Sequence, residues 1–153
     1  MNQLNIREAL VSDIPQIQRV RNAVKENTLS DPALVPDTDV ADYLTRRGKG
    51  WVSLQEDRVT GFAIVSVLDQ NVWALFIEPG FDKQGIGREL HDQMMDWYFK
   101  QTAETIWLST TPGTRADRFY RKAGWEEAGT YGKEEIKFTM TRENWTKQKS
   151  LPV

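Results

Sequence analysis

The chain of 153 residues is 39% hydrophobic and 27% charged, which is typical of a globular protein. It has no cysteine and one histidine, His91, so disulfides, a thiolate nucleophile and a multi-histidine metal centre are excluded. The net charge of −2 argues against a dedicated nucleic-acid binder, because such proteins are usually basic. No secretory-signal pattern or long apolar run is present, so we expect a cytoplasmic protein without a membrane segment.

Hydrophobic periodicity predicts, in chain order, a strand, two helices, three strands, a helix, a strand, a helix and two strands. We expect strands over 4–9, 51–55, 59–68, 72–77, 105–108, 125–130 and 135–141, and helices over 14–27, 40–47, 85–100 and 114–123. The expected helix caps are Ser12-Asp13, Thr38-Asp39 and Thr114, and the expected helix ends are Gly48 and Gly124. This order indicates one mixed α/β or α+β domain over residues 1–141, followed by a loose polar tail over 142–153.

Closely spaced glycines open the longest predicted helix, in the sequence Gln84-Gly85-Ile86-Gly87-Arg88. The first N–H groups of a helix lack internal acceptors and lie at the positive end of its dipole. Because Gly85 and Gly87 have no Cβ, a diphosphate can approach the backbone there, with Lys83 and Arg88 at the rim. The signatures of a P-loop and of a dinucleotide-binding turn are both absent. A Gly-x-Gly at a helix start also fits a tight turn that binds nothing.

Two motifs resemble those of the GCN5-related N-acetyltransferase (GNAT) superfamily. The sequence Asp82-Lys83-Gln84-Gly85-Ile86-Gly87 is similar to its acyl-CoA loop, Gln/Arg-x-x-Gly-x-Gly/Ala, although Asp82 departs from the pattern. Residues 113–125 resemble a second region, Asn-x-x-Ala-x-x-Phe-Tyr-x-x-x-Gly-Phe, through Ala116, Phe119-Tyr120 and Gly124-Trp125. Gly113 replaces the Asn of that region, so its side-chain hydrogen bond is lost. The order of the elements agrees along nearly the whole chain.

The resemblance implies a GNAT-type fold, a mixed, mostly antiparallel central sheet of about seven strands flanked by four helices. It implies acetyl-CoA as the acyl donor, CoA as a product, and no metal. The expected donor-binding residues are Leu75, Phe76, Ile77, Lys83, Gln84, Gly85, Ile86, Gly87, Arg88, Thr110, Arg115, Phe119 and Lys122. The basic face of Arg115, Arg118 and Lys122 could meet the 3′-phosphate of CoA or could simply be solvated.

The implied reaction is direct attack of a neutral amine on the thioester carbonyl. Tyr120 would then protonate the departing thiolate, since a phenol keeps its proton at neutral pH; alternatively it only packs its helix on the sheet. Glu78, at the end of a central strand, is the candidate general base, or an exposed carboxylate that merely pairs with a nearby Arg or Lys.

In this superfamily the first two helices and their loop usually build the acceptor side. Here that stretch carries mixed charges, including Arg21 and Asp37, which leaves the charge of the acceptor open. The candidate acceptor-binding residues are Glu26, Asn27, Trp73 and Glu134, with Glu135 as an alternative to Glu134. The expected acceptor is a small-molecule primary amine, without nucleic-acid or membrane partners and with a possible homodimer. The alternatives are a non-catalytic acyl-CoA-binding module, an O-acyltransferase, or a protein N-terminal or lysine acetyltransferase.

Overall fold

The computed structural model describes residues 4–24 and 35–150, and the chain divides into two compact units, 1–98 and 99–153. The first unit contains β1 (Asn5–Glu8), a 3-10 turn η1 (Val11–Asp13), α1 (Ile14–Ala23), α2 (Asp37–Asp42), a π-helical turn η4 (Tyr43–Arg47), β2 (Gly48–Gln55), β3 (Arg58–Ser66) and β4 (Asn71–Ile77). Helix α3 (Ile86–Gln101) begins in this unit and ends in the next.

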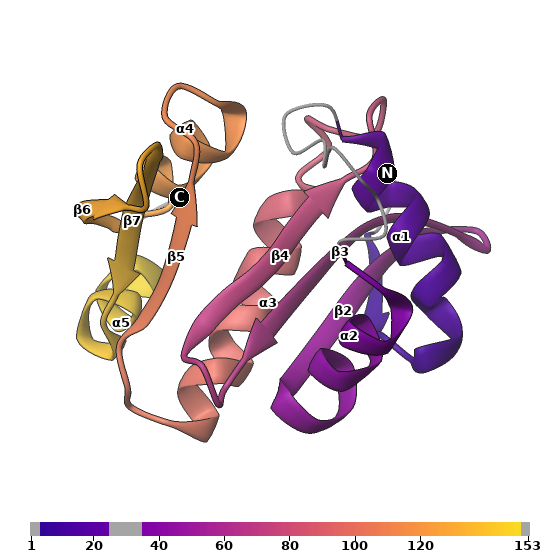
Figure 1. Cartoon of the computed structure of the whole chain (residues 1–153), viewed down its shortest axis with the longest axis horizontal. Coiled ribbons are helices and arrows are strands. Elements are labelled where there is room, and N and C mark those ends of the chain that lie inside the picture. Colours follow the sequence, from indigo (N-terminus) through magenta and orange to yellow (C-terminus); the bar gives the residue numbers. More distant parts are fainter. Residues whose placement is uncertain (1–3, 25–34, 151–153) are drawn as a thin grey trace. The chain divides into compact units, whose positions relative to one another are not determined.

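The first unit is an antiparallel sheet in the order β1-β2-β3-β4. Figure 1 shows α1 and α2 on one face of these strands and α3 on the other. Because successive strand residues point to opposite faces, Phe62 and Phe76, which are partners in register, lie on the same face. Their face packs against Ile17 and Val20 of α1, which are fully buried. This core fixes α1 above β3 and β4.

The second unit contains the end of α3, β5 (Ile106–Thr110), α4 (Arg115–Lys122), β6 (Glu126–Tyr131), β7 (Glu135–Met140) and α5 (Arg142–Ser150). Its strands are antiparallel in the order β5-β7-β6. Helix α4 presents Tyr120, which lies near the rings of Trp125 and Phe138. All three side chains are buried, so the second motif of the sequence forms the apolar centre of this unit.

The predicted fold class is confirmed. Seven strands occur in the described ranges, in the predicted chain order, and the pairings within each unit are antiparallel. The helix count is slightly different, because the same ranges contain five α-helices where four were expected. Among these helices, none is both long enough and apolar enough to cross a bilayer.

The expectation of a loose tail is wrong for residues 142–150, which form α5. Thr141 begins this helix by accepting a hydrogen bond from the backbone N–H of Asn144 on its hydroxyl, at 3.0 Å. Trp145 is 4% exposed, so it anchors the helix although the surrounding residues are polar. The Asn144 side chain also donates to the carbonyl of Gly124 at 2.9 Å, which ties α5 to the end of α4.

Two further helix boundaries differ from the prediction. Helix α2 begins at Asp37 after Pro36 as its N-cap, so Thr38-Asp39 lies inside the helix and does not cap it. Helix α1 ends at Ala23 because Val24 is already extended, and residues 25–27 of the predicted continuation lie outside the described ranges. Asp13 occupies the predicted cap position, but its carboxylate accepts from Arg7 and from the N–H of Leu10 instead of from α1.

Candidate active site

The loop between β4 and α3 contains three residues in the left-handed region of backbone space. These are Gly80 (φ 97°), Lys83 (φ 67°) and Gly85 (φ 80°). At Gly85, which directly precedes α3, a Cβ would meet no atom within 4 Å. The glycine is therefore needed for its conformation and not for lack of space, and the backbone beside it is open on that side.

The start of α3 presents the backbone donors that the sequence predicts. Its first helical hydrogen bond runs from the N–H of Glu89 to the carbonyl of Gly85, at 3.1 Å. The N–H groups of Ile86, Gly87 and Arg88 come before that bond, so they have no acceptor within the helix. The positive end of the helix dipole lies at the same place. This terminus is suited to an anion.

The Asp82 side chain takes part in the structure of the loop before this terminus. The Asp82 carboxylate accepts a hydrogen bond from the N–H of Gly80 at 3.2 Å, so it folds back on its own loop. Lys83 and Gln84 are exposed. Arg88 is paired along the helix with Asp92 at 3.3 Å. Asp82 therefore has a role in shaping the turn, which the family pattern did not predict.

The end of β4, where the acyl arm is expected, is half-buried at Leu75, Phe76 and Ile77. Leu75 pairs in register with Ala63, whereas Phe76 pairs with Phe62. Since neighbouring residues on a strand face opposite sides, Phe76 points to the α1 side of the sheet, where its ring centroid is 5.5 Å from that of Phe62.

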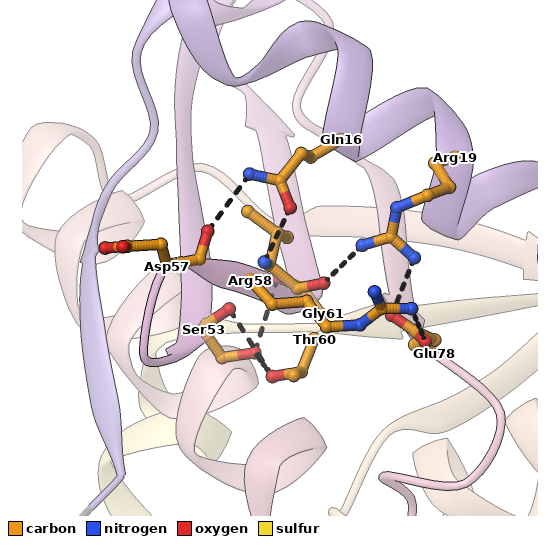
Figure 2. A network of polar contacts seen from close by, with 9 residues as sticks. Gln16, Arg19, Ser53, Asp57, Arg58, Thr60, Gly61 and Glu78 are labelled. Atoms are coloured by element: carbon orange, nitrogen blue, oxygen red, sulfur yellow. Dashed lines mark hydrogen bonds and ion pairs between the residues drawn. The ribbon is translucent and has the colours of Figure 1, made fainter.

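Glu78, the candidate base, is held by two arginines, and we call Glu78, Arg19 and Arg58 the Glu78 cluster. Arg19 Nη1 lies 2.8 Å from Glu78 Oε1, and Arg58 Nη2 lies 2.5 Å from Glu78 Oε2. Figure 2 shows how the network continues into α1 and β3. There Arg19 Nη2 donates to the carbonyl of Val59, whose N–H donates to Gln16 Oε1, both at 2.9 Å. Glu78 thus links α1, β3 and the end of β4.

The environment of Glu78 makes it a weak base. It is 8% exposed, and burial by itself would raise its pKa. The hydrogen bonds from Arg58 and Arg19 outweigh burial and hold the pKa of Glu78 below its ordinary value. The expected pairing with arginine is present, but the expected exposure is not. The role of general base stays a prediction, and these two ion pairs argue against it.

In the second unit, the loop before α4 is held by Asp117, which sequence reasoning did not single out. Gly113 has φ 80°, and its N–H donates to Asp117 Oδ2 at 2.8 Å. The Thr114 hydroxyl accepts from the N–H of Asp117, so Thr114 is the N-cap as predicted. Asp117 therefore orders the loop in the absence of the usual Asn. The Thr-x-x-Asp spacing, typical of a capping box, was the available signal.

Tyr120, the candidate acid, is 6% exposed. Its ring meets those of Phe119 and Trp125 edge-on, with centroids 5.3 and 5.6 Å away. Burial raises the pKa of Tyr120 above its ordinary value, so the phenol is protonated at neutral pH. That state fits a proton donor and a packing residue equally, and the acid role stays a prediction.

The other predicted donor-binding residues of the second unit lie at its surface. Arg115 and Lys122 are exposed on α4, while Thr110 and Phe119 are half-buried. Arg118 donates to the carbonyl of Gly113 at 2.9 Å, so it braces the loop and is not merely solvated.

The predicted acceptor-binding residues fall in both units and in the part of the chain outside the described ranges. Glu26 and Asn27 lie outside the described ranges. Trp73 is half-buried and stacks on Tyr43, with centroids 3.9 Å apart and planes at 7°. Glu134 is exposed in the turn between β6 and β7. Glu135 accepts from the hydroxyl of Ser109 at 2.9 Å.

The one histidine of the chain, His91, lies on α3. It is fully buried, with Nδ1 2.8 Å from Asp92 Oδ1. Burial lowers the pKa of His91, against the opposing effect of Asp92. Among the residues of known position, no group of three or more His, Asp or Glu side chains could hold a metal ion.

Comparison with known proteins agrees with the GNAT resemblance of the two sequence motifs. Residues 17–125 match the model of the acetyltransferase (GNAT) family, and the chain belongs to that family. The comparison with curated proteins finds no match.

Solved structures share the fold at low sequence identity. PaiA N-acetyltransferase from Thermoplasma acidophilum, solved in complex with coenzyme A, is 14% identical with a TM-score of 0.80, over 92% of this chain and 99% of that one. A GNAT-family acetyltransferase from Staphylococcus aureus is 19% identical, with a TM-score of 0.79 over 91% and 99%. Ribosomal-protein-S18-alanine N-acetyltransferase from Escherichia coli is 20% identical, with a TM-score of 0.74 over 91% and 94%.

Proposed function

We propose that this chain transfers an acetyl group from acetyl-CoA to the primary amine of a small molecule, by direct attack of the amine on the thioester. The observation that carries the proposal is the open start of α3, where Gly85 has a positive φ and the N–H groups of the first turn precede the first helical bond. Membership of the acetyltransferase family supports an acetyl donor, and one structural neighbour is a coenzyme A complex.

In this proposal the backbone of Ile86, Gly87 and Arg88 holds the diphosphate of acetyl-CoA. Backbone groups at the end of β4, around Ile77, bind the pantetheine arm and the carbonyl oxygen of the acetyl group. Donors placed there stabilise the oxyanion that forms when the amine attacks. The family resemblance adds Lys83 and Gln84 in the first unit, and assigns Thr110, Arg115, Phe119 and Lys122 to the same ligand in the second.

Two protons move in the reaction. The attacking amine loses one, and the thiolate of CoA gains one. Tyr120 is the proposed donor to the thiolate, consistent with its raised pKa. For the amine proton, water is the better acceptor than Glu78, because the arginines that pair with Glu78 lower its basicity.

The experiment is calorimetry of acetyl-CoA binding together with mass spectrometry of a panel of primary amines incubated with the protein and acetyl-CoA. Wild type should bind acetyl-CoA and release CoA only when an amine is acetylated. Gly87→Val should abolish binding, because its side chain occupies the diphosphate position. Gly87→Ala is the matched control and should retain most binding, since the family pattern accepts Ala there. Equal binding by a folded Gly87→Val protein would show that the loop assignment is wrong.

A non-catalytic acyl-CoA-binding module is the second candidate, favoured by the departures from the motifs at Asp82 and Gly113. It predicts acetyl-CoA binding with no acetylated amine from the panel. Tyr120→Phe separates the two further: an enzyme that uses this phenol as its acid should lose turnover and keep its affinity for acetyl-CoA.

A further inference from the structure

Arg21 is a buried cation, and two of its nitrogen atoms have no hydrogen-bond partner among the described residues. It lies on α1 and is 6% exposed. Its Nε and Nη2 atoms are fully buried, and no acceptor in the described part of the chain reaches them. An unsatisfied donor in the interior costs free energy, and a charged one costs more than a neutral one. Such a costly group is more readily explained by a ligand that pairs with it than by the stability of the fold.

The surroundings of Arg21 are aromatic, and we call Arg21, Phe62, Trp73 and Phe76 the Arg21 cluster. The Cζ atom of Arg21 lies 5.7 Å from the ring centroid of Phe62, 4.9 Å from that of Trp73 and 5.3 Å from that of Phe76. Ring faces attract a cation and offset part of its desolvation. They accept no strong hydrogen bonds, so the N–H groups in the plane of the guanidinium stay unsatisfied.

The charge on Arg21 is nevertheless retained. Burial lowers the pKa of Arg21 to about 10, which keeps the guanidinium protonated at neutral pH. Desolvation is the one cause of this shift, and no carboxylate contributes to it. Arg21 therefore offers an anion a positive charge that no described carboxylate has taken.

The position of the Arg21 cluster connects it to the proposed reaction. Trp73 and Phe76 belong to β4, and Phe76 directly precedes Ile77, where we place the acetyl group. The Arg21 guanidinium therefore packs, on the α1 side of the sheet, against the residue that precedes this position. Trp73 and Phe76 are half-buried, so this side of the cluster reaches the protein surface.

We infer that Arg21 binds a carboxylate of the acceptor, and that the acceptor is therefore a small molecule with both a primary amine and a carboxylate, as in an amino acid. This inference rests on the proposed function. A planar guanidinium can donate two parallel hydrogen bonds to a carboxylate, and Nε and Nη2 of Arg21 have no acceptor among the described residues. Because both atoms are buried, the side chains around them must move apart when the carboxylate binds. The aromatic walls exclude water and strengthen the pair. A polycationic acceptor is disfavoured by the same charge.

The test compares amino acids with their carboxamides as acceptors, together with a linear polyamine. Wild type should prefer the acid over its carboxamide by at least about tenfold in kcat/KM, a difference of about 1.4 kcal/mol, and most of it should be in KM. The amine of a carboxamide is less basic, so more of it is neutral and reactive, and amine ionisation cannot produce this preference. Arg21→Met should bring the ratio near one, mainly by raising KM for the acid.

Arg46→Met is the matched control, because Arg46 is exposed in η4 and paired with Asp42; it should keep the wild-type ratio. Equal use of acid and carboxamide by wild type, preference for the polyamine, or an unchanged ratio in Arg21→Met would each overturn the inference. The wild-type comparison decides the matter even if Arg21→Met fails to fold.

Thermal shift with the amino acid alone separates this inference from the proposed function. The acid, and not its carboxamide, should raise Tm of wild type and leave Tm of Arg21→Met unchanged. If this shift is seen but no amine is acetylated, the carboxylate site stands and the transfer activity is refuted. If amines are acetylated without an acid preference, the transfer activity stands and the carboxylate site is refuted.

Discussion

Arg19 and Arg21 lie two residues apart on α1 and differ in their hydrogen bonding. Arg19 donates to Glu78 and to the carbonyl of Val59, both within 2.9 Å. Arg21 is more buried, yet its Nε and Nη2 reach no acceptor in the described ranges and its guanidinium lies among aromatic rings. Both side chains project toward β3 and β4, so the difference does not come from their general location.

This difference separates a charge that holds the fold together from one that is available to a ligand. A paired buried charge is costly to disrupt, since removing one partner leaves the other uncompensated. An unpaired buried charge already carries that penalty, so replacing it with an apolar group relieves the fold. The Glu78 cluster and the Arg21 cluster should therefore respond to substitution with opposite signs.

The largest expected effect is that of Glu78→Leu. The change leaves both arginines of the Glu78 cluster without their carboxylate, and the free energy of unfolding should fall by about 2–3 kcal/mol, below the usual range for a buried pair because the arginines are partly exposed. Urea unfolding measures it. Glu127→Leu, which removes an exposed partner of Arg121, is the control and should change stability several times less.

Turnover of the same variant decides whether Glu78 is also the base. A structural carboxylate predicts a kcat per folded molecule within severalfold of wild type. A general base predicts a loss of roughly a hundredfold or more, and that result would restore Glu78 to the mechanism.

Arg21→Met should act in the opposite direction and more weakly. Removing an unpaired buried charge stabilises the fold, whereas losing its contacts with three aromatic rings destabilises it. We expect a net gain of about 1 kcal/mol in the free energy of unfolding, which a matched urea titration would detect. If Arg21→Met instead lowered the free energy of unfolding as much as Glu78→Leu does, Arg21 would be a structural residue like Arg19. The proposed contrast between the two arginines would then be wrong.

The pH dependence of stability gives a third, smaller effect. Because the arginines hold the pKa of Glu78 below its unfolded value, Glu78 binds a proton less readily when folded. Its contribution is complete above the unfolded pKa and is lost as pH falls through the folded pKa. Thermal unfolding between neutral pH and about pH 3 should therefore show a steeper acid loss in wild type than in Glu78→Gln.

The smallest effect is expected within the Glu78 cluster itself. The Arg58 side chain is 54% exposed, against 36% for Arg19, and Arg19 has Val59 as a second acceptor. Arg19→Ala should therefore lower Tm more than Arg58→Ala does. Equal shifts would show that the two ion pairs contribute alike and that the backbone contact adds nothing.

Features encoded over a few residues were predictable from the sequence. The positive φ at Gly85 and the cap at Thr114 both follow from local chemistry, and so do the antiparallel strands with their alternating pattern. The end of α4 at Gly124 also follows from local chemistry. The N–H of Gly124 donates to the carbonyl of Arg121, and the N–H of Trp125 donates to the carbonyl of Tyr120, which is the pattern expected where a glycine ends a helix.

Features that depend on distant partners were not predictable. The distinction between Arg19 and Arg21 rests on Glu78, which is 59 positions from Arg19, and on rings from β3 and β4. Helix α5 was missed because its polar composition gives little periodic signal, and Trp145 becomes informative only once it is seen to be buried. The roles of Tyr120 and of the donor-binding loop come from family resemblance, and they stay predictions.

The buried histidine limits what a pH–rate profile of this protein can report. His91 is fully buried with a lowered pKa, while the pKa of Tyr120 is raised and that of Arg21 is lowered to about 10. Burial thus favours the neutral form of His91, the one histidine of the chain, at neutral pH and above. A rate that climbs above neutral pH would therefore follow the deprotonation of the incoming amine and not that of His91, so the profile should shift from one acceptor to the next with the basicity of each.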